Sequence, residues 1–206
     1  MLDLRSFQIN RKLNYTNEFL RKLIHLFDSI IPLSLFIIDR STLLLILTPI
    51  TIIFIFLDFT RHHINFISRI YLLFFDRVTR NIEKKKNHVT GATYYLLGCL
   101  ITVYFFDNIS IIMASLLIMS ISDSCAALIG LKYGKTKIYN NKTLEGSFAF
   151  LISTIIILSL FVPDLSLFEL SFIAISVTFV ELISFYKMND NLTIPISASI
   201  LIQYFI

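Results

Sequence analysis

Long apolar runs separated by short polar segments dominate the chain, and they predict transmembrane helices. A span needs about 20 mostly apolar residues, and several runs approach that length without alternating between apolar and polar positions. Membrane-barrel strands do alternate, so the pattern favours helices. We expect one all-α domain over residues 1–206, a polytopic bundle with spans near residues 24–39, 42–59, 90–106, 109–131, 145–162, 166–186 and 191–206.

One further apolar segment, residues 64–75, is too short to cross a bilayer comfortably and carries Arg69 near its middle. Counting it as a span would also invert every later loop. We therefore expect an amphipathic helix that lies in the membrane interface.

Positive charge is distributed unevenly between the loops. If the basic N-terminal segment 1–23 is cytoplasmic, then so are 60–89, 132–144 and 187–190. These four segments hold 5, 7, 4 and 1 of the 18 Lys and Arg residues, and the opposite side holds only Arg40. Since Lys and Arg favour cytoplasmic loops, the pattern predicts a multi-pass integral membrane protein with a cytoplasmic N-terminus.

Composition agrees with this class. Hydrophobic residues make up 56% of the chain and charged residues 16%, against about 25% charged in soluble domains. The net charge of +4 is explained by membrane orientation, so we expect no nucleic-acid partner. Cys99 and Cys125 lie in apolar stretches without disulfide or zinc spacing. The first 22 residues lack the apolar core and cleavage site of a signal peptide.

Candidate chemistry gathers between residues 122 and 147, where acids, lysines and glycines interrupt the apolar pattern. Carboxylates hold Mg²⁺ together with substrate phosphates, lysines neutralise phosphates, and glycines let the backbone approach closely. The G-x-x-x-x-G-K-[ST] nucleotide loop is absent. The inventory predicts a nucleotide-phosphate site at the membrane surface, with candidates Asp123, Gly130, Gly134, Lys135, Lys137, Lys142, Thr143, Glu145, Gly146 and Ser147.

Two further groups lie at the cytoplasmic ends of predicted spans. Arg21 and His25 share a helix face, with Lys22 beside them, and Asp28 lies one turn deeper. Glu181 interrupts an apolar span. Ionisable residues at such depths need a partner or a function.

Structural roles remain open for the same residues. Arg21 and Lys22 suit an interfacial anchor, and Asp123 suits a carboxylate that bonds a neighbouring helix. Asn141 or Thr143 could cap the helix in which Glu145 occupies the first turn, and Asp190 or Asn191 could cap the last helix. The basic run 80–88 suits a topology anchor.

Taken in order, these motifs resemble the dolichol kinase, phytol kinase and CTP-dependent diacylglycerol kinase family of membrane lipid kinases. The similarity runs from about residue 20 to the end of the chain. Its motifs are Arg21-Lys22-x-x-His25, the run from Thr90 to Gly98, Asp123 to Gly134-Lys135, Lys142-Thr143-Leu144-Glu145-Gly146-Ser147, and Glu181 with Asp190-Asn191-Leu192-Thr193-Ile194-Pro195.

The resemblance implies an integral membrane enzyme that transfers the γ-phosphate of a nucleoside triphosphate, typically CTP, to a lipid hydroxyl with Mg²⁺. Asp123, Lys142 and Glu145 would form the nucleotide–metal site, with Asp123 and Glu145 on the metal. Some relatives carry two adjacent acids where this chain has Asn189-Asp190.

For the reaction itself, phosphoryl transfer depends on positioning and charge neutralisation. We expect Lys142, Lys135 and Lys137 to neutralise phosphate oxygens, with Arg21, Lys22 and the glycine segments around the nucleotide. The lipid alcohol would enter sideways between helices, and Asp190 or His25 would accept its proton. Glu181 is a further catalytic candidate.

Two other functions stay open. Phosphatidate cytidylyltransferase has a similar Asp…Gly…Lys-Thr-x-Glu-Gly stretch, but its C-terminal Pro-Gly-His-Gly-Gly signature is missing here, and no His follows His88. A transporter or scaffold could use Asp28 and Glu181 as ion sites. The sequence names neither the lipid alcohol (polyprenol, phytol or diacylglycerol) nor the nucleotide (CTP, UTP or ATP).

Overall fold

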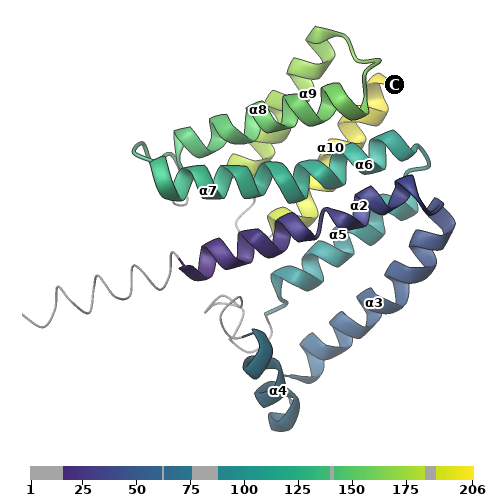
Figure 1. Cartoon of the computed structure of the whole chain (residues 1–206), viewed down its shortest axis with the longest axis vertical. Coiled ribbons are helices and arrows are strands. Elements are labelled where there is room, and N and C mark those ends of the chain that lie inside the picture. Colours follow the sequence, from purple (N-terminus) through teal and green to yellow (C-terminus); the bar gives the residue numbers. More distant parts are fainter. Residues whose placement is uncertain (1–15, 62, 76–87, 140–141, 184–188) are drawn as a thin grey trace, which may run out of the picture.

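The computed structural model describes residues 16–61, 63–75, 88–139, 142–183 and 189–206 (Figure 1). All regular elements within these ranges are helices, accompanied by one isolated β-bridge between Lys137 and Thr143. The expected all-α fold is confirmed. Residues 80–87 of the basic run and the candidate cap Asn141 lie outside the described residues.

The centre of the bundle is one continuous helix. It consists of α6 (Ile109–Leu117), the π-helical turn η2 (Ile118–Ser122) and α7 (Asp123–Tyr133). Its middle, including Leu116, Ile118 and Met119, is fully buried. A helix that is apolar on all sides is typical of the interior of a membrane bundle, which explains why no amphipathic pattern marks this segment.

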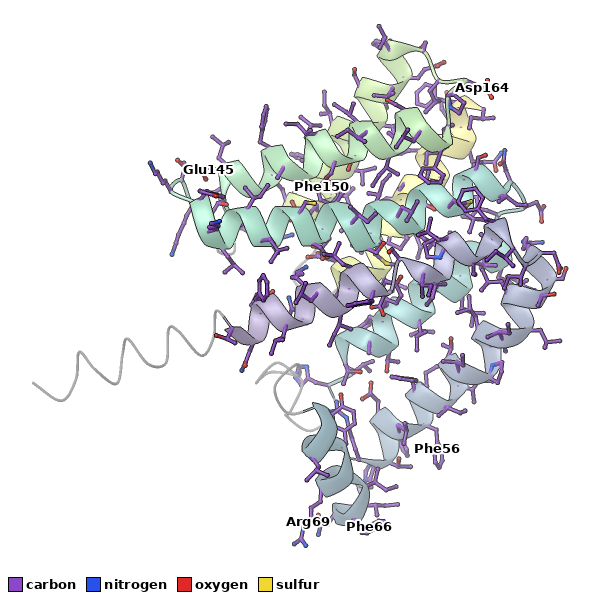
Figure 2. All side chains as sticks on the ribbon, in the orientation of Figure 1. Phe56, Phe66, Arg69, Glu145, Phe150 and Asp164 are labelled. Carbon is purple, nitrogen blue, oxygen red and sulfur yellow. The ribbon has the colours of Figure 1, made fainter. Side chains whose placement is uncertain are left out.

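The other helices surround this axis. After α2 (Ile30–Leu33) and η1 (Ser34–Phe36) come α3 (Arg40–Thr60), α4 (Asn65–Phe75), α5 (Gly91–Phe105), α8 (Leu144–Phe161), α9 (Leu167–Ile183) and α10 (Asp190–Phe205). The pairs α7–α8, α3–α5, α10–α5, α10–α9 and α8–α9 pack most extensively. Figure 2 shows Phe150 inside the bundle, and Glu145 and Asp164 at opposite ends of α8.

The helices agree closely with the predicted spans, except at the start of the chain. There the segment 24–39 is not one continuous helix: a helix covers 16–27, turns at Asp28 and Ser29, and continues as α2. Pro32 accounts for the interruption because it has no N–H for the Asp28 carbonyl. That carbonyl accepts hydrogen bonds from the Ile31 N–H, at 3.0 Å, and from the Tyr95 hydroxyl, at 2.9 Å.

Three helices in the described part of the chain are long and apolar enough to cross a membrane: Arg40–Thr60, Ile109–Tyr133 and Leu144–Phe161. α5 is apolar but shorter. The segment expected in the interface forms α4, which projects from the end of α3 with Phe66 and Arg69 at its outer tip (Figure 2). The seven-span arrangement and its orientation stay predictions.

We expect the loop after α7 to face the cytoplasm and the loop before α6 to face the opposite side, because of the charge distribution described above. In a Cys125→Ala background, Tyr139→Cys should react with a membrane-impermeant maleimide only from the cytoplasmic side, and Asn108→Cys only from the other. Cys99 is fully buried, so we expect it not to react with the maleimide. The reverse labelling pattern would overturn the orientation.

Candidate functional site

The helix over 16–27 places a basic side chain against the acid of the central helix. Lys22 forms a buried ion pair with the carboxylate of Asp123, and the Ser124 hydroxyl donates to the Lys22 carbonyl at 3.4 Å. The buried His25 also interacts electrostatically with Asp123. Arg21 points elsewhere, to Glu18 one turn earlier. The structure therefore brings Lys22, His25 and Asp123 together.

Lys142 organises a second group. Its ammonium nitrogen lies 2.7 Å from Glu181 Oε1 and 3.1 Å from Asp190 Oδ2, and it donates to the Glu181 backbone carbonyl as well. Burial alone lowers the pKa of Lys142, but the carboxylates of Asp190 and Glu181 outweigh burial and hold that pKa above its ordinary value. Lys142 therefore stays protonated at neutral pH.

These two groups form one cluster, because Asp123 interacts electrostatically with Lys142 and with Glu181. The loop before α8 carries Lys142, the end of α9 carries Glu181, and the first residue of α10 is Asp190. Four elements distant in sequence thus converge with the helix over 16–27. The first-turn position of Asp190 suits an acid, while the cap itself is Asn189, which accepts the Asn191 N–H at 3.1 Å. The expectation that Asp190 or Asn191 caps α10 was wrong.

Three buried oxygens of the cluster have no hydrogen-bond partner among the described residues: Glu181 Oε2, Asp190 Oδ1 and Thr193 Oγ1. Glu181 is only 4% exposed, so water does not readily replace the missing partner. A buried polar atom without a partner costs about 1–3 kcal/mol, and more when charged. Such atoms commonly mark a place where a ligand supplies the missing contact.

The loop between α7 and α8 differs from the expected phosphate cradle. Glu145 accepts the Thr136 N–H at 3.3 and 3.4 Å, so its carboxylate stabilises this loop (Figure 2). Thr143 caps α8 by accepting the Gly146 N–H at 3.2 Å, which confirms the predicted cap. The Ser147 hydroxyl donates to the Thr143 carbonyl at 3.2 Å. Lys135 and Lys137 are exposed on this loop.

The glycines here serve close packing. A Cβ at Gly146 would lie 2.7 Å from the Ala126 carbonyl oxygen, and one at Gly130 would lie 2.9 Å from Thr143 Oγ1. A side chain at Gly134 would collide with the same threonine. The glycines thus let α7 and α8 cross closely, and this crossing fixes Lys142 relative to Asp123.

Sequence reasoning missed two features. Asp58 and Arg61 form a buried ion pair of 2.8 Å that ties α3 to the start of α5, where Thr90 and Thr93 donate to Asp58 Oδ2. Their i, i+3 spacing was the available signal. The other feature is the π-helical turn directly before Asp123. Such turns often occur at functional sites, and they shift the direction of the following side chains.

Comparison with known proteins places this chain in a family. The model of the cytidylyltransferase family matches residues 20–190. An uncharacterised protein of Rickettsia prowazekii is 34% identical over 184 residues, which are 86% of this chain and 89% of that protein. No solved structure matches significantly.

Two relatives carry functional names. The CTP-dependent diacylglycerol kinase of Saccharomyces cerevisiae is 31% identical over 175 residues, covering 72% of this chain and 59% of the kinase. The dolichol kinase of Schizosaccharomyces pombe is 30% identical over 137 residues, covering 61% of this chain and 27% of that kinase. The chain belongs to the cytidylyltransferase family, and its expected relationship to dolichol kinase and CTP-dependent diacylglycerol kinase is confirmed.

Proposed function

We propose that this protein is a CTP-dependent membrane lipid kinase, which transfers the γ-phosphate of CTP to the hydroxyl of a lipid alcohol. The observation that carries the proposal is the convergence of Asp123, Glu181 and Asp190 with the ammonium groups of Lys22 and Lys142 in an apolar bundle. Ionisable residues inside a membrane bundle pair with one another in this way, and they commonly mark substrate or ion sites. The names of the two kinase relatives support the reaction class.

The acids of the cluster fit a divalent cation. Although three acids belong to the cluster, the described residues contain no group of three or more His, Cys, Asp or Glu side chains placed to hold a metal ion together. Mg²⁺ needs only one or two carboxylates beside substrate phosphates. Glu181 Oε2 and Asp190 Oδ1 are buried oxygens that lack hydrogen-bond partners in the described part of the chain. We assign Asp123 and Glu181 as the main ligands, while Glu145, the other expected ligand, is engaged by the loop backbone. Bound Mg²⁺ would neutralise charge on the terminal phosphates.

The basic residues would handle the nucleotide. Lys142 is protonated and its ammonium lies beside Glu181 and Asp190, so we expect it to neutralise a phosphate oxygen as charge moves from the γ-phosphate to the leaving group. Lys135 and Lys137 are exposed on the loop, where they can attract the triphosphate. Arg21 is half-buried and pairs with Glu18, so its contribution would come from within the protein. Lys22 keeps Asp123 ionised and in place.

The transfer needs one proton acceptor. The lipid O–H bond breaks as its oxygen bonds to the γ-phosphorus, and the bond from that phosphorus to the β–γ bridging oxygen breaks, so CDP leaves. Asp190 can take the proton on Oδ1, since Oδ2 faces Lys142. His25, next to Asp123, is the alternative acceptor. Because these residues lie at predicted cytoplasmic helix ends, we place the active site at the cytoplasmic face.

A direct assay tests this function. Protein purified in detergent is incubated with Mg²⁺, a panel of lipid alcohols, and CTP labelled at either the γ- or the α-phosphate, with ATP, UTP and GTP in parallel. We expect a lipid monophosphate that carries the γ-label and no α-label. Failure of every lipid and nucleotide pair to give this product would contradict the proposal.

The family's description supports a second candidate, a cytidylyltransferase, and the sequence resemblance described above suggests phosphatidate as its lipid substrate. That reaction joins the CMP part of CTP to a lipid phosphate and releases pyrophosphate. The α-label would then enter a CDP-lipid when phosphatidate is supplied, so the same assay separates the two reactions.

A further inference from the structure

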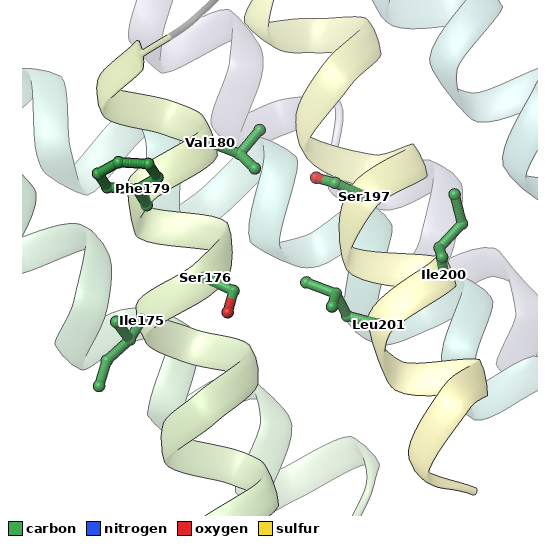
Figure 3. A pocket seen from close by; sticks show the side chains of 7 residues that line it. All are labelled: Ile175, Ser176, Phe179, Val180, Ser197, Ile200 and Leu201. Atoms are coloured by element: carbon green, nitrogen blue, oxygen red, sulfur yellow. The ribbon is translucent and has the colours of Figure 1, made fainter.

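A groove of about 550 Å³ lies between α9 and α10, and no residue of the candidate site lines it. Its walls are apolar except for two serines. Figure 3 shows Ser176 and Val180 of α9 facing Ser197 and Leu201 of α10 across the space between these helices. The volume lies within the range of ligand sites, about 300–1,000 Å³.

The side chains of α10 that lead into the groove change from polar to apolar along the helix. Asp190, Thr193, Ser197 and Leu201 follow one another at spacings of three and four residues, so they form one stripe along α10. The stripe begins at the acid that pairs with Lys142, passes the buried Thr193 hydroxyl, and ends in aliphatic side chains within the groove. This stripe therefore links the groove to the cluster along α10.

The α9 side reaches the cluster in the same direction. Val180 lines the groove, and the next residue, Glu181, carries the partnerless Oε2. The Ser176 hydroxyl has no hydrogen-bond partner within the described ranges, whereas Ser197 donates to the Thr193 carbonyl at 2.7 Å. Polar atoms that need a partner thus lie at one end of an apolar channel, an arrangement that matches a molecule with a polar head and a long hydrocarbon tail.

We propose that the groove between α9 and α10 holds the hydrocarbon tail of the lipid alcohol, with the hydroxyl directed along α10 toward Thr193, Asp190 and Glu181. Thr193 then donates to or accepts from the lipid hydroxyl, and Ser176 and Val180 set the width available to the first part of the tail. This inference rests on the proposed function. It makes the α9–α10 face the lateral entrance for the lipid.

Photo-crosslinking tests the site without turnover. A long-chain alcohol with a diazirine in its tail is irradiated with the full-length protein in nanodiscs, and the labelled peptides are identified by mass spectrometry. We expect labelling concentrated on α9 and α10, reduced roughly tenfold by Ser176→Trp, which fills the groove. Ser171→Trp is the matched control, because Ser171 is an exposed serine of the same helix outside the groove.

Enzyme kinetics supply a second readout. Ser176→Trp should raise KM for a long-chain lipid alcohol roughly tenfold or more and leave KM for the nucleotide unchanged, with little effect on a short alcohol whose tail ends before Ser176. Should Ser176→Trp not fold, Leu201→Trp closes the groove from α10.

Several results would overturn the inference. Labelling that is spread uniformly over lipid-facing helices such as α3, and that Ser176→Trp does not change, would mean that ordinary bilayer lipid fills the groove. A change of oligomeric state in Ser176→Trp would assign it to a second copy of the chain. Crosslinking requires no nucleotide. Labelling localised to α9 and α10 without any kinase product would therefore refute the proposed function but still support the groove as a lipid-binding site.

Discussion

The Asp123→Asn variant is expected to lose lipid phosphorylation almost completely. The change keeps the size of the side chain but removes the charge that faces Lys22, His25 and Lys142 in the cluster. An amide is also a poor Mg²⁺ ligand. Losing one such charged contact in a transition state commonly costs about 2.7–4 kcal/mol, or roughly 100- to 1,000-fold in rate. The measurement is kcat/KM for CTP at fixed lipid.

Stability must be separated from catalysis in this variant, because Asp123→Asn leaves the Lys22 ammonium buried without its counter-ion. We expect the double variant Lys22→Met, Asp123→Asn to regain thermal stability without regaining activity. Asp107→Asn is the matched control: Asp107 is 91% exposed and pairs with Arg40 on the surface, where ion pairs contribute little. Near-normal activity of Asp123→Asn would return this acid to a purely structural role.

Removing the ammonium of Lys142 should have an effect of similar size. Lys142→Ala deletes the one cation that contacts both Glu181 and Asp190 among the described residues. We expect kcat/KM for CTP to fall roughly 30- to 1,000-fold, since a positioned phosphate contact is commonly worth about 2–4 kcal/mol. Lys132→Ala, which changes an exposed lysine near the end of α7, should keep most of the activity.

A second comparison isolates the role of the charge. Lys142→Ala leaves the Glu181 carboxylate buried without its cation, which costs about 3–5 kcal/mol when such a pair is broken. Lys142→Ala with Glu181→Gln should recover much of that stability and none of the activity. If Lys142→Ala and Lys132→Ala reduce the rate equally and modestly, the lysines act through a diffuse electrostatic field. The proposal of a specific contact between Lys142 and a phosphate would then be wrong.

The helical class and most helix positions could be predicted from the chain because apolar segment length carries the signal. The expected 42–59 and 90–106 correspond to α3 at Arg40–Thr60 and α5 at Gly91–Phe105. The first helix was misplaced, since its break depends on Pro32 and on the Tyr95 hydroxyl 67 residues away. A hydropathy pattern does not contain that contact.

The choice of chemistry-bearing residues was also accessible, because an acid or a lysine in an apolar segment is costly and therefore conspicuous. This singled out Asp123, Lys142, Glu181 and Asp190. The sequence did not predict which residues these side chains contact. Lys142 was expected to neutralise phosphate oxygens, and the structure adds that it pairs with two carboxylates, while Glu145, expected on the metal, accepts a hydrogen bond from the loop backbone.

The sequence by itself determined two things: that the chain is a hydrophobic helical bundle, and which rare polar residues it carries. Both follow from local composition and order. Only the tertiary structure decided which residues meet. The close crossing of α7 and α8 at Gly130 and Gly146 fixes Lys142 relative to Asp123. The packing of α10 against α9 brings Asp190 and Glu181 to the same ammonium. Such contacts depend on how helices distant in sequence pack, and this packing is set by side-chain shape across the whole bundle.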